Sequence, residues 1–188
     1  MVAAEFYCKE AKLNNSISMK RLKRSVKLLL IFVLFFGSFS CSTEANLKNS
    51  CYSKQDPPRN TGKVSIEQGI WGDIWFWKGD FMPVGRGDIC QVQRTVYIYE
   101  LTTMEDADQI GYSPFFSNIH TNLITTAESD AEGFFQVALE PGRYSLFIKE
   151  GDHYYSNSFG AGREIFPVTV TTGEVSEVLI NITTEATF

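Results

Sequence analysis

The sequence predicts an all-β protein, an antiparallel β-sandwich that follows an N-terminal export signal. Three observations predict this fold class. From Lys63 onward, apolar residues recur mostly at every second position, the period that places alternate side chains on opposite faces of a strand. Gly, Pro, Asn and Asp bound these stretches, and no segment of about 12 residues or more carries a good helical face. Seven short strands at this spacing indicate a seven-stranded sandwich.

Charge is divided unevenly along the 188 residues, which hold 17 basic and 22 acidic side chains. Residues 1–40 contain seven Lys or Arg and two Asp or Glu, whereas residues 41–188 contain ten basic and twenty acidic residues. The length suits a single domain. Because an acidic body without a basic cluster lacks the charge that neutralises phosphates, we do not expect nucleic acid as a partner.

Residues 1–40 have the layout of a signal peptide. Several basic residues precede an uninterrupted apolar run from Leu28 to Phe36, and small residues follow up to Ser40. A helix needs roughly 20 residues to cross the hydrocarbon core of a membrane, so this shorter run favours export over a permanent span. Residues 1–18 would make the basic region unusually long, and we therefore expect the true start at Met19.

Cys41 directly follows the expected cut site, and two interpretations share that site. Ser38 and Ser40 satisfy the small-residue requirement of an ordinary signal peptidase, whereas a cysteine after the cut resembles the lipobox of bacterial lipoproteins. Ser38 stands where those lipoproteins usually have Leu. Lipid on Cys41 would leave Cys51 and Cys90 as a pair suited to an oxidising compartment. We therefore favour a lipid anchor at the outer membrane of a bacterial envelope, with plain secretion as the alternative.

Residues 41–62 are rich in Ser, Asn, Lys and Pro and hold few large apolar groups. This composition predicts a flexible tether, which separates the anchor from a domain over residues 63–188. A disulfide from Cys51 to Cys90 would close a loop of about 40 residues and contribute roughly 4 kcal/mol in the chain-entropy model. Such a disulfide would fasten the tether to the domain.

The expected strands follow one another between turns of recognisable chemistry. The turn Asp130–Gly133 has a glycine that can take a positive φ, and Pro141-Gly142 fits the central positions of a tight turn. Pro167 removes a ladder donor and predicts an edge or the start of a strand. The seven expected strands cover residues 68–77, 91–101, 121–128, 135–139, 144–148, 165–171 and 178–182.

Two of these turns carry a family resemblance. The run Asp130-Ala131-Glu132-Gly133-Phe134-Phe135, followed by residues 139–146 with Leu139, Pro141, Gly142 and Tyr144, resembles the hairpin signature of carboxypeptidase regulatory-like domains. Gly69-Ile70-Trp71-Gly72 and Met82-Pro83 also resemble members of that family in bacterial surface lipoproteins. The resemblance covers roughly residues 64–183 and implies a transthyretin-like, Ig-like sandwich. It implies a non-catalytic accessory or interaction module, because the motif residues form turns and core.

Aromatic residues give the most specific expectation about contacts. Trp71, Trp75 and Trp77 share one face of the first strand, while apolar residues occupy the other, so both faces need a cover. We expect the 102–120 loop to provide it, and the alternative is a partner or ligand. Phe115-Phe116-Ser117-Asn118 and Tyr154-Tyr155-Ser156-Asn157 repeat one pattern, which indicates either a paired recognition rim or aromatics that plug loops. The possible contact patch comprises Trp71, Trp75, Trp77, Phe115, Phe116, Tyr154 and Tyr155.

The sequence offers no catalytic constellation. His120 and His153 are the two histidines, and neither has the spacing of a metal ligand relative to cysteine or carboxylate motifs. The acidic stretches 105–108 and 128–132 do not match a calcium-binding loop, and we expect them to be solvated. No cofactor, metal or enzymatic activity is expected. The prediction is a non-enzymatic, lipid-anchored interaction module with a protein partner; the alternative is a small-ligand or carbohydrate-binding protein that uses the aromatic patch.

Overall fold

The structure is a computed structural model that describes residues 50–188. The predicted leader, the predicted lipidation site Cys41 and the first part of the predicted tether lie outside the described residues. Residues 50–188 are all-β, as predicted, with twelve strands in two sheets and two single turns of 3-10 helix at Thr61–Lys63 and Ala161–Arg163. Within these residues no helix is both long enough and apolar enough to cross a membrane.

The first sheet, sheet A, is organised around its central strand, β2 (Gly69–Asp80). One edge of β2 pairs in parallel with β12 (Val175–Thr187) over nearly its whole length. The other edge pairs in succession with two antiparallel strands, β8 (Phe134–Ala138) and β3 (Gly87–Gln91). The short strand β1 (Cys51–Ser53) continues the sheet beyond β3. Sheet A is therefore antiparallel except for the pair of β2 and β12.

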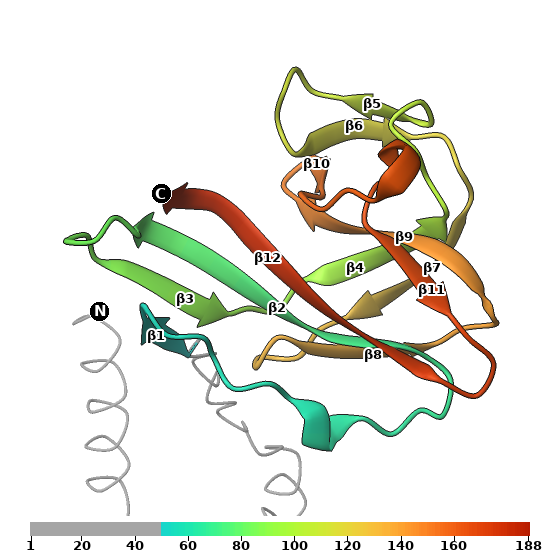
Figure 1. Ribbon diagram of the computed structural model, residues 1–188, viewed down its shortest axis with the longest axis horizontal. Helices are drawn as coiled ribbons and strands as arrows, with labels where there is room; N and C mark the ends of the chain where they lie inside the picture. The colour runs from blue at the N-terminus through green and yellow to red at the C-terminus, as the bar shows by residue number, and fades with distance from the viewer. Residues whose placement is uncertain (1–49) are drawn as a thin grey trace, which may run out of the picture. The chain divides into compact units, whose positions relative to one another are not determined.

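The second sheet, sheet B, has the order β5-β6-β10-β9-β4-β7. The strand β11 pairs with β9 on the same edge as β10, at the end of β9 that β10 does not reach. Figure 1 shows that the far ends of β2, β3 and β12 extend past sheet B. The strands of sheet B are β4 (Thr95–Glu100), β5 (Ala107–Gln109), β6 (Phe115–Ile119), β7 (Leu123–Glu128), β9 (Gly142–Glu150), β10 (His153–Tyr155) and β11 (Pro167–Val170).

The main core lies between the two sheets and is built by the period-two alternation that the sequence shows. Ile70 and Ile74 of β2 are wholly buried, as are Val96 and Ile98 of β4. A second, smaller core around Phe116 lies on the other face of sheet B. Because the chain buries both faces of sheet B over this area, the aromatic content of the domain goes largely into packing.

Every expected strand segment contains a strand, but the structure has more than seven strands. The expected strand 91–101 contains only the last residue of β3, Gln91, and all of β4. Between them the chain leaves sheet A and enters sheet B at Thr95. Arg94 makes this crossing, and its backbone N–H donates to the Ser129 hydroxyl at 2.7 Å. The strands that we did not expect have three to five residues: β1, β3, β5, β6 and β10.

The described part of the predicted tether, residues 50–62, packs against sheet A rather than hanging free. Cys51 pairs with Cys90 in the register of β1 and β3, and a disulfide joins them as predicted. Pro57 is buried, and Arg59 bonds to a carboxylate of β2. The polar composition of this segment predicted a flexible tether. The sequence alone does not show that sheet A holds a buried carboxylate, Asp73, that fixes Arg59 in place.

Candidate interaction site

The predicted aromatic patch is divided by the fold. Trp71, Trp75, Phe116 and Tyr155 are buried, so they have almost no surface with which to contact a partner. Trp77, Phe115 and Tyr154 remain partly exposed. These three side chains come from different sheets, Trp77 from sheet A and the other two from sheet B. The seven residues therefore do not form one continuous surface.

The outer face of sheet A is covered by the segment that precedes it, and not by the 102–120 loop as we expected. The guanidinium of Arg59 lies 5.5 Å from the ring centroid of Trp71 and 5.8 Å from that of Trp75. Pro58 also contacts this face, since its carbonyl accepts a hydrogen bond from the Gln91 side chain. Residues 102–120 instead build β5 and β6 of sheet B.

The two repeated aromatic segments are brought together by direct strand pairing. In the ladder between β6 and β10, Phe116 lies opposite Tyr154 and Phe115 opposite Tyr155. Phe115 and Tyr155 contact each other edge to face, with ring centroids 5.5 Å apart. Phe116 and Tyr155 are wholly buried, so these two side chains fit the second interpretation of the repeat, in which the aromatic residues pack inside the domain.

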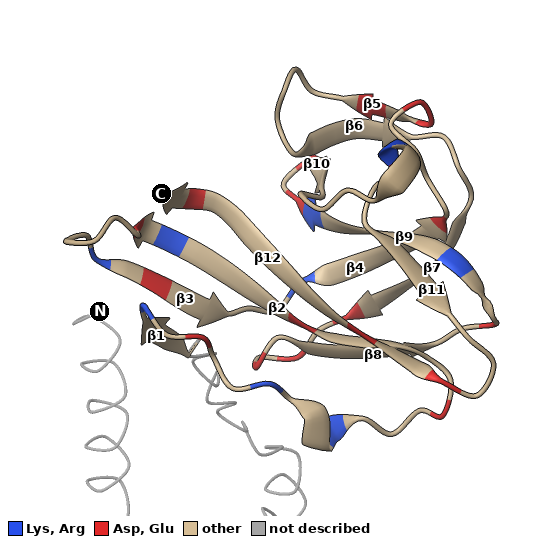
Figure 2. Cartoon of the chain, viewed as in Figure 1, with Lys and Arg blue, Asp and Glu red and all other residues tan. Residues whose placement is uncertain are grey.

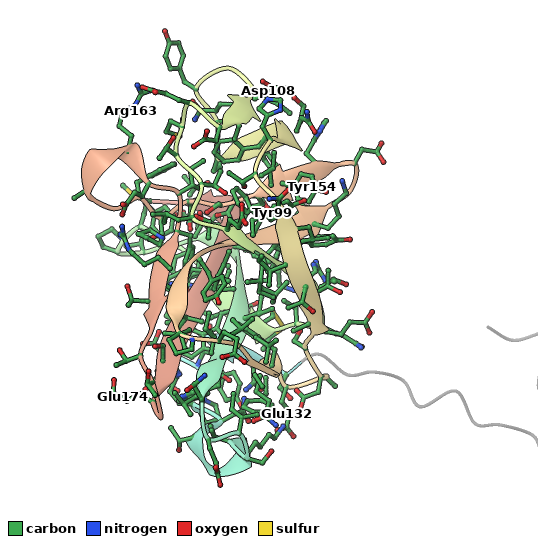
Figure 3. The ribbon with its side chains drawn as sticks, turned by 90° about the vertical axis from the view of Figure 1, so that its right-hand side faces the viewer. Tyr99, Asp108, Glu132, Tyr154, Arg163 and Glu174 are labelled. Atoms are coloured by element: carbon green, nitrogen blue, oxygen red, sulfur yellow. A yellow bond between two sulfur atoms is a disulfide. The ribbon has the colours of Figure 1, made fainter. Side chains whose placement is uncertain are left out.

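A cluster of tyrosines on sheet B keeps some surface. The hydroxyls of Tyr99 and Tyr154 are 3.2 Å apart, and Figure 3 shows the two residues side by side. Burial is the main cause that raises the pKa of the Tyr99 hydroxyl, and the hydrogen bond with Tyr154 raises this pKa further. The ammonium of Lys149 lies 4.2 Å from the centroid of the Tyr154 ring, a cation–π contact. Tyr154 and Tyr97, which packs edge to face on it, are partly exposed, whereas Tyr99 is buried.

A group of exposed and partly exposed apolar side chains lies at the far end of β2, in a region where we noted only the family resemblance of Met82-Pro83. We call it the tip cluster: Trp77, Phe81, Met82, Val84 and Phe188. The ring centroids of Trp77 and Phe81 are 4.9 Å apart, and those of Phe81 and Phe188 are 5.7 Å apart. The exposed fractions are 96% for Val84, 69% for Phe188 and 48% for Met82.

Backbone and side-chain bonds hold the tip cluster in place. The Phe81 N–H donates to the Thr187 carbonyl at 2.8 Å, which joins the β2–β3 turn to the end of β12. The Lys54 ammonium donates to the Met82 carbonyl at 2.8 Å. The indole N–H of Trp77 donates to Asn181 of β12 at 2.9 Å. The apolar side chains therefore extend from a fixed frame, which is the arrangement that an interaction site needs.

The sequence did contain a signal for this site. The turn between β2 and β3 carries Phe81-Met82-Pro83-Val84, whereas exposed hairpin turns are usually polar. Four apolar residues in such a turn indicate an interaction surface or a buried loop. The sequence pattern alone could not separate these outcomes, because the expected strand 91–101 includes only the last residue of β3 and the hairpin of β2 and β3 was not recognised.

The two histidines and most of the acidic side chains considered above are exposed in the structure. No group of three or more His, Cys, Asp or Glu side chains in residues 50–188 is placed to hold a metal ion. His120 lies 3.1 Å from Asp108, and both side chains are about half exposed. The nearby Ser117 hydroxyl donates to the backbone carbonyl of Asp108 at 3.3 Å. His153 is exposed at the start of β10. Asp130 and Glu132 both form ion pairs with the ammonium group of Lys63.

The chain matches no protein-family model, no curated protein and no solved structure. Its functional interpretation therefore rests on the residues and on the geometry described above.

Proposed function

We propose that this protein is a non-enzymatic, exported lipoprotein whose β-sandwich binds a partner protein at a bacterial envelope through the tip cluster. The basic and apolar layout of residues 1–40, followed by Cys41, supports export and lipid anchoring. An oxidising compartment suits the disulfide between Cys51 and Cys90. An acyl anchor would hold an acidic domain at a membrane that its charge would not attract.

The observation that carries the proposed contact is the exposure of the tip cluster. Exposed, contiguous apolar groups on a soluble domain mark interaction sites more often than isolated apolar side chains do. Phe81, Met82 and Val84 come from one turn, and Phe188 joins them from another strand. Aromatic residues and methionine are also the types enriched at the centres of protein interfaces.

We further propose that residues 64–183 are a carboxypeptidase regulatory-like domain. The motif glycine Gly133 supports this, since it takes a φ of +76° and an added Cβ would lie 2.5 Å from the Ile74 carbonyl oxygen. The motif tyrosine Tyr144 donates from its hydroxyl to the Glu140 carbonyl at 2.8 Å. Both motif positions therefore serve the turns of the sandwich, as the resemblance implies.

Two measurements test the proposed function. Mass spectrometry of the mature N-terminus, after expression of the full chain in a bacterium, should find acyl chains on Cys41. A photo-crosslinking residue at Val84 should capture one defined envelope protein, while the same residue at Tyr112, whose exposed fraction is 108%, should not. Equal capture from both positions, or an unmodified Cys41, would contradict the proposal.

A variant pair checks that the capture reflects binding. Met82→Ser in the Val84 crosslinking protein should reduce the adduct several-fold, because it removes apolar area from the interface. Ile110→Ser, at an exposed position outside the tip cluster, should leave it unchanged. If a glycan rather than a protein is retained, and Trp77→Ala abolishes its binding, the carbohydrate-binding alternative replaces the protein partner.

A further inference from the structure

A second surface lies at the opposite end of β2, where the two sheets separate. A cleft of about 610 Å³ opens there between β7 of sheet B and β8 of sheet A. Its apolar lining includes Ile66, Ile124 and Leu139. Figure 1 shows β8 of sheet A below β7 of sheet B. The tip cluster and this cleft share no residue, so the two surfaces are independent.

Both strands that border the cleft are edge strands. β7 pairs only with β4, and β8 pairs only with β2, within the described residues. An edge strand presents a row of backbone N–H and C=O groups to whatever lies beside it. A cleft bordered by two such rows is suited to an extended polypeptide, which can bond to one or both edges along its backbone.

The register shows which backbone groups of β7 face the cleft side. The Ser129 N–H donates to the Arg94 carbonyl at 2.9 Å, so the pair of these two residues is a hydrogen-bonded pair. Because hydrogen-bonded and non-bonded pairs alternate along an antiparallel ladder, Thr126 and Glu128 direct their backbone groups away from β4. Thr126 is exposed. Its N–H is therefore available to an added strand.

The same reasoning applies to β8. The Ile74 N–H donates to the Gly133 carbonyl at 2.9 Å, which makes that pair hydrogen-bonded. By alternation, Gln136 and Ala138 direct their backbone groups away from β2. Ala138 is exposed and lines the cleft. Each side of the cleft thus offers unpaired backbone groups.

The charge of the cleft selects among extended polypeptides. Glu67 and Glu140 line it, and neither carboxylate has an ion pair within residues 50–188. No lysine or arginine is among its lining residues. Figure 2 shows acidic positions at this end of sheet A. A second copy of the chain would bring the same carboxylates and a net charge of −10 over residues 41–188, which disfavours self-association through this edge.

From this geometry we propose that the cleft binds an extended, basic segment of a partner protein by strand addition, chiefly to β7. The backbone of the segment pairs with the outward groups of Thr126 and its neighbours. Alternate apolar side chains enter the cleft against Ile66, Ile124 and Leu139. Lysine or arginine side chains at neighbouring positions meet Glu67 and Glu140.

A set of matched peptides tests the proposal on the mature protein. The probe is an eight-residue peptide of alternating valine and lysine, and fluorescence anisotropy measures its dissociation constant. We expect binding at least tenfold tighter than that of the peptide with glutamate in place of lysine. N-methylation of alternate backbone nitrogens in the probe should also weaken binding at least tenfold, because it removes the donors that a ladder requires.

Protein variants locate the site. Thr126→Pro should abolish binding, since proline has no N–H to donate, whereas Thr126→Ala keeps the N–H and should bind as the original protein does. The double variant Glu67→Gln and Glu140→Gln should weaken binding about tenfold and reduce its salt dependence. Circular dichroism and thermal melting check that each variant folds. If Thr126→Pro does not fold, the N-methylated peptide still decides the question.

Three outcomes would overturn the proposal. One is equal affinity for the lysine and glutamate peptides, and another is binding that N-methylation leaves unchanged. The third is a concentration-dependent dimer in sedimentation analysis that Thr126→Pro converts to a monomer, since the occupant would then be a second copy. Substitutions in the tip cluster should change none of these measurements, so failure here is separate from failure of the proposed function.

Discussion

The Nε of Arg59 donates to a carboxylate oxygen of Asp73 at 2.7 Å, and the Asp73 side chain is completely buried. Asn60 reinforces this contact, because its side-chain amide donates to the second oxygen of Asp73 at 2.6 Å. The pair fastens residues 54–62 across the outer face of β2. A buried carboxylate on the tryptophan face of β2 thus explains why a polar segment covers that face.

Removing the buried carboxylate should destabilise the domain. Asp73→Ala removes the buried carboxylate that accepts from the Arg59 Nε and from the Asn60 side-chain amide, and we expect a loss of about 3 kcal/mol in the free energy of unfolding. Glu177→Gln is the matched control, since Glu177 also pairs with Arg59 but is half exposed, and it should cost less than about 1 kcal/mol. Urea denaturation measures both; equal losses would contradict the role of Asp73.

The disulfide between Cys51 and Cys90 should contribute strongly to stability. It closes a loop with a sequence separation of 39 residues, for which chain entropy gives about 4 kcal/mol. Reductant should therefore lower the melting temperature of the purified protein. The variant with Cys51→Ser and Cys90→Ser should already melt at the lower temperature and should not respond to reductant. A melting temperature that reductant leaves unchanged in the original protein would refute this.

Two glycines with positive φ should respond differently to alanine. Gly133 has a φ of +76°, and an added Cβ would meet the Ile74 carbonyl oxygen at 2.5 Å, so the backbone must shift to accept Gly133→Ala. Gly151 has a φ of +58° but open space around it, and Gly151→Ala should cost only the conformational preference, about 1 kcal/mol. We expect a clearly larger loss for Gly133→Ala in chemical denaturation. A similar loss for both would argue against close packing of the 130–133 turn.

Stability should fall in acid partly through Asp130. Burial tends to raise its pKa, but hydrogen bonds from Lys63 and from the N–H groups of Phe134 and Glu132 outweigh this, so the pKa of Asp130 lies below its usual 3.8. A lowered folded-state pKa stabilises the fold above the unfolded value, and this contribution is lost as the pH falls through the folded value.

The variant Asp130→Asn isolates this contribution to acid stability. The difference in free energy of unfolding between the original protein and the variant should be largest near about pH 6 and should shrink toward about pH 3. Denaturant titrations at several pH values measure this difference. A difference that stays constant across that range would show that ionisation of Asp130 does not matter for stability.

The sequence predicted the long, alternating strands well because each carries its own signal. β12 buries every second side chain over part of its length, whereas β9 buries every side chain from Tyr144 to Ile148, because sheet B has a core on each face. Turns with glycine or proline precede both strands. The strands β5 and β10 have three residues each, too few for a period of two to be recognised. The parallel pairing of β12 with β2 had no local signal, since partner choice depends on the whole sheet.

The aromatic patch was only partly predictable for a similar reason. Alternation correctly grouped Trp71, Trp75 and Trp77 on one face, and the repeated motif identified two segments that the fold pairs directly. Exposure could not be read from alternation, because it depends on which segment covers the face. Arg59 supplies that cover for Trp71 and Trp75. Trp77 lies beyond it, beside Phe81.

The pairing of β2 with β12 also limits when this domain can fold. Gly69 pairs with Val175, about 100 residues later in the chain, so sheet A cannot close until nearly the whole domain is available. Contacts over such distances slow folding, because the entropy of closing the intervening loop must be overcome before the contacts stabilise it. An emerging chain would therefore lack a complete sheet A for most of its synthesis, and the outer edge of β2 would stay unpaired until the last strand is made.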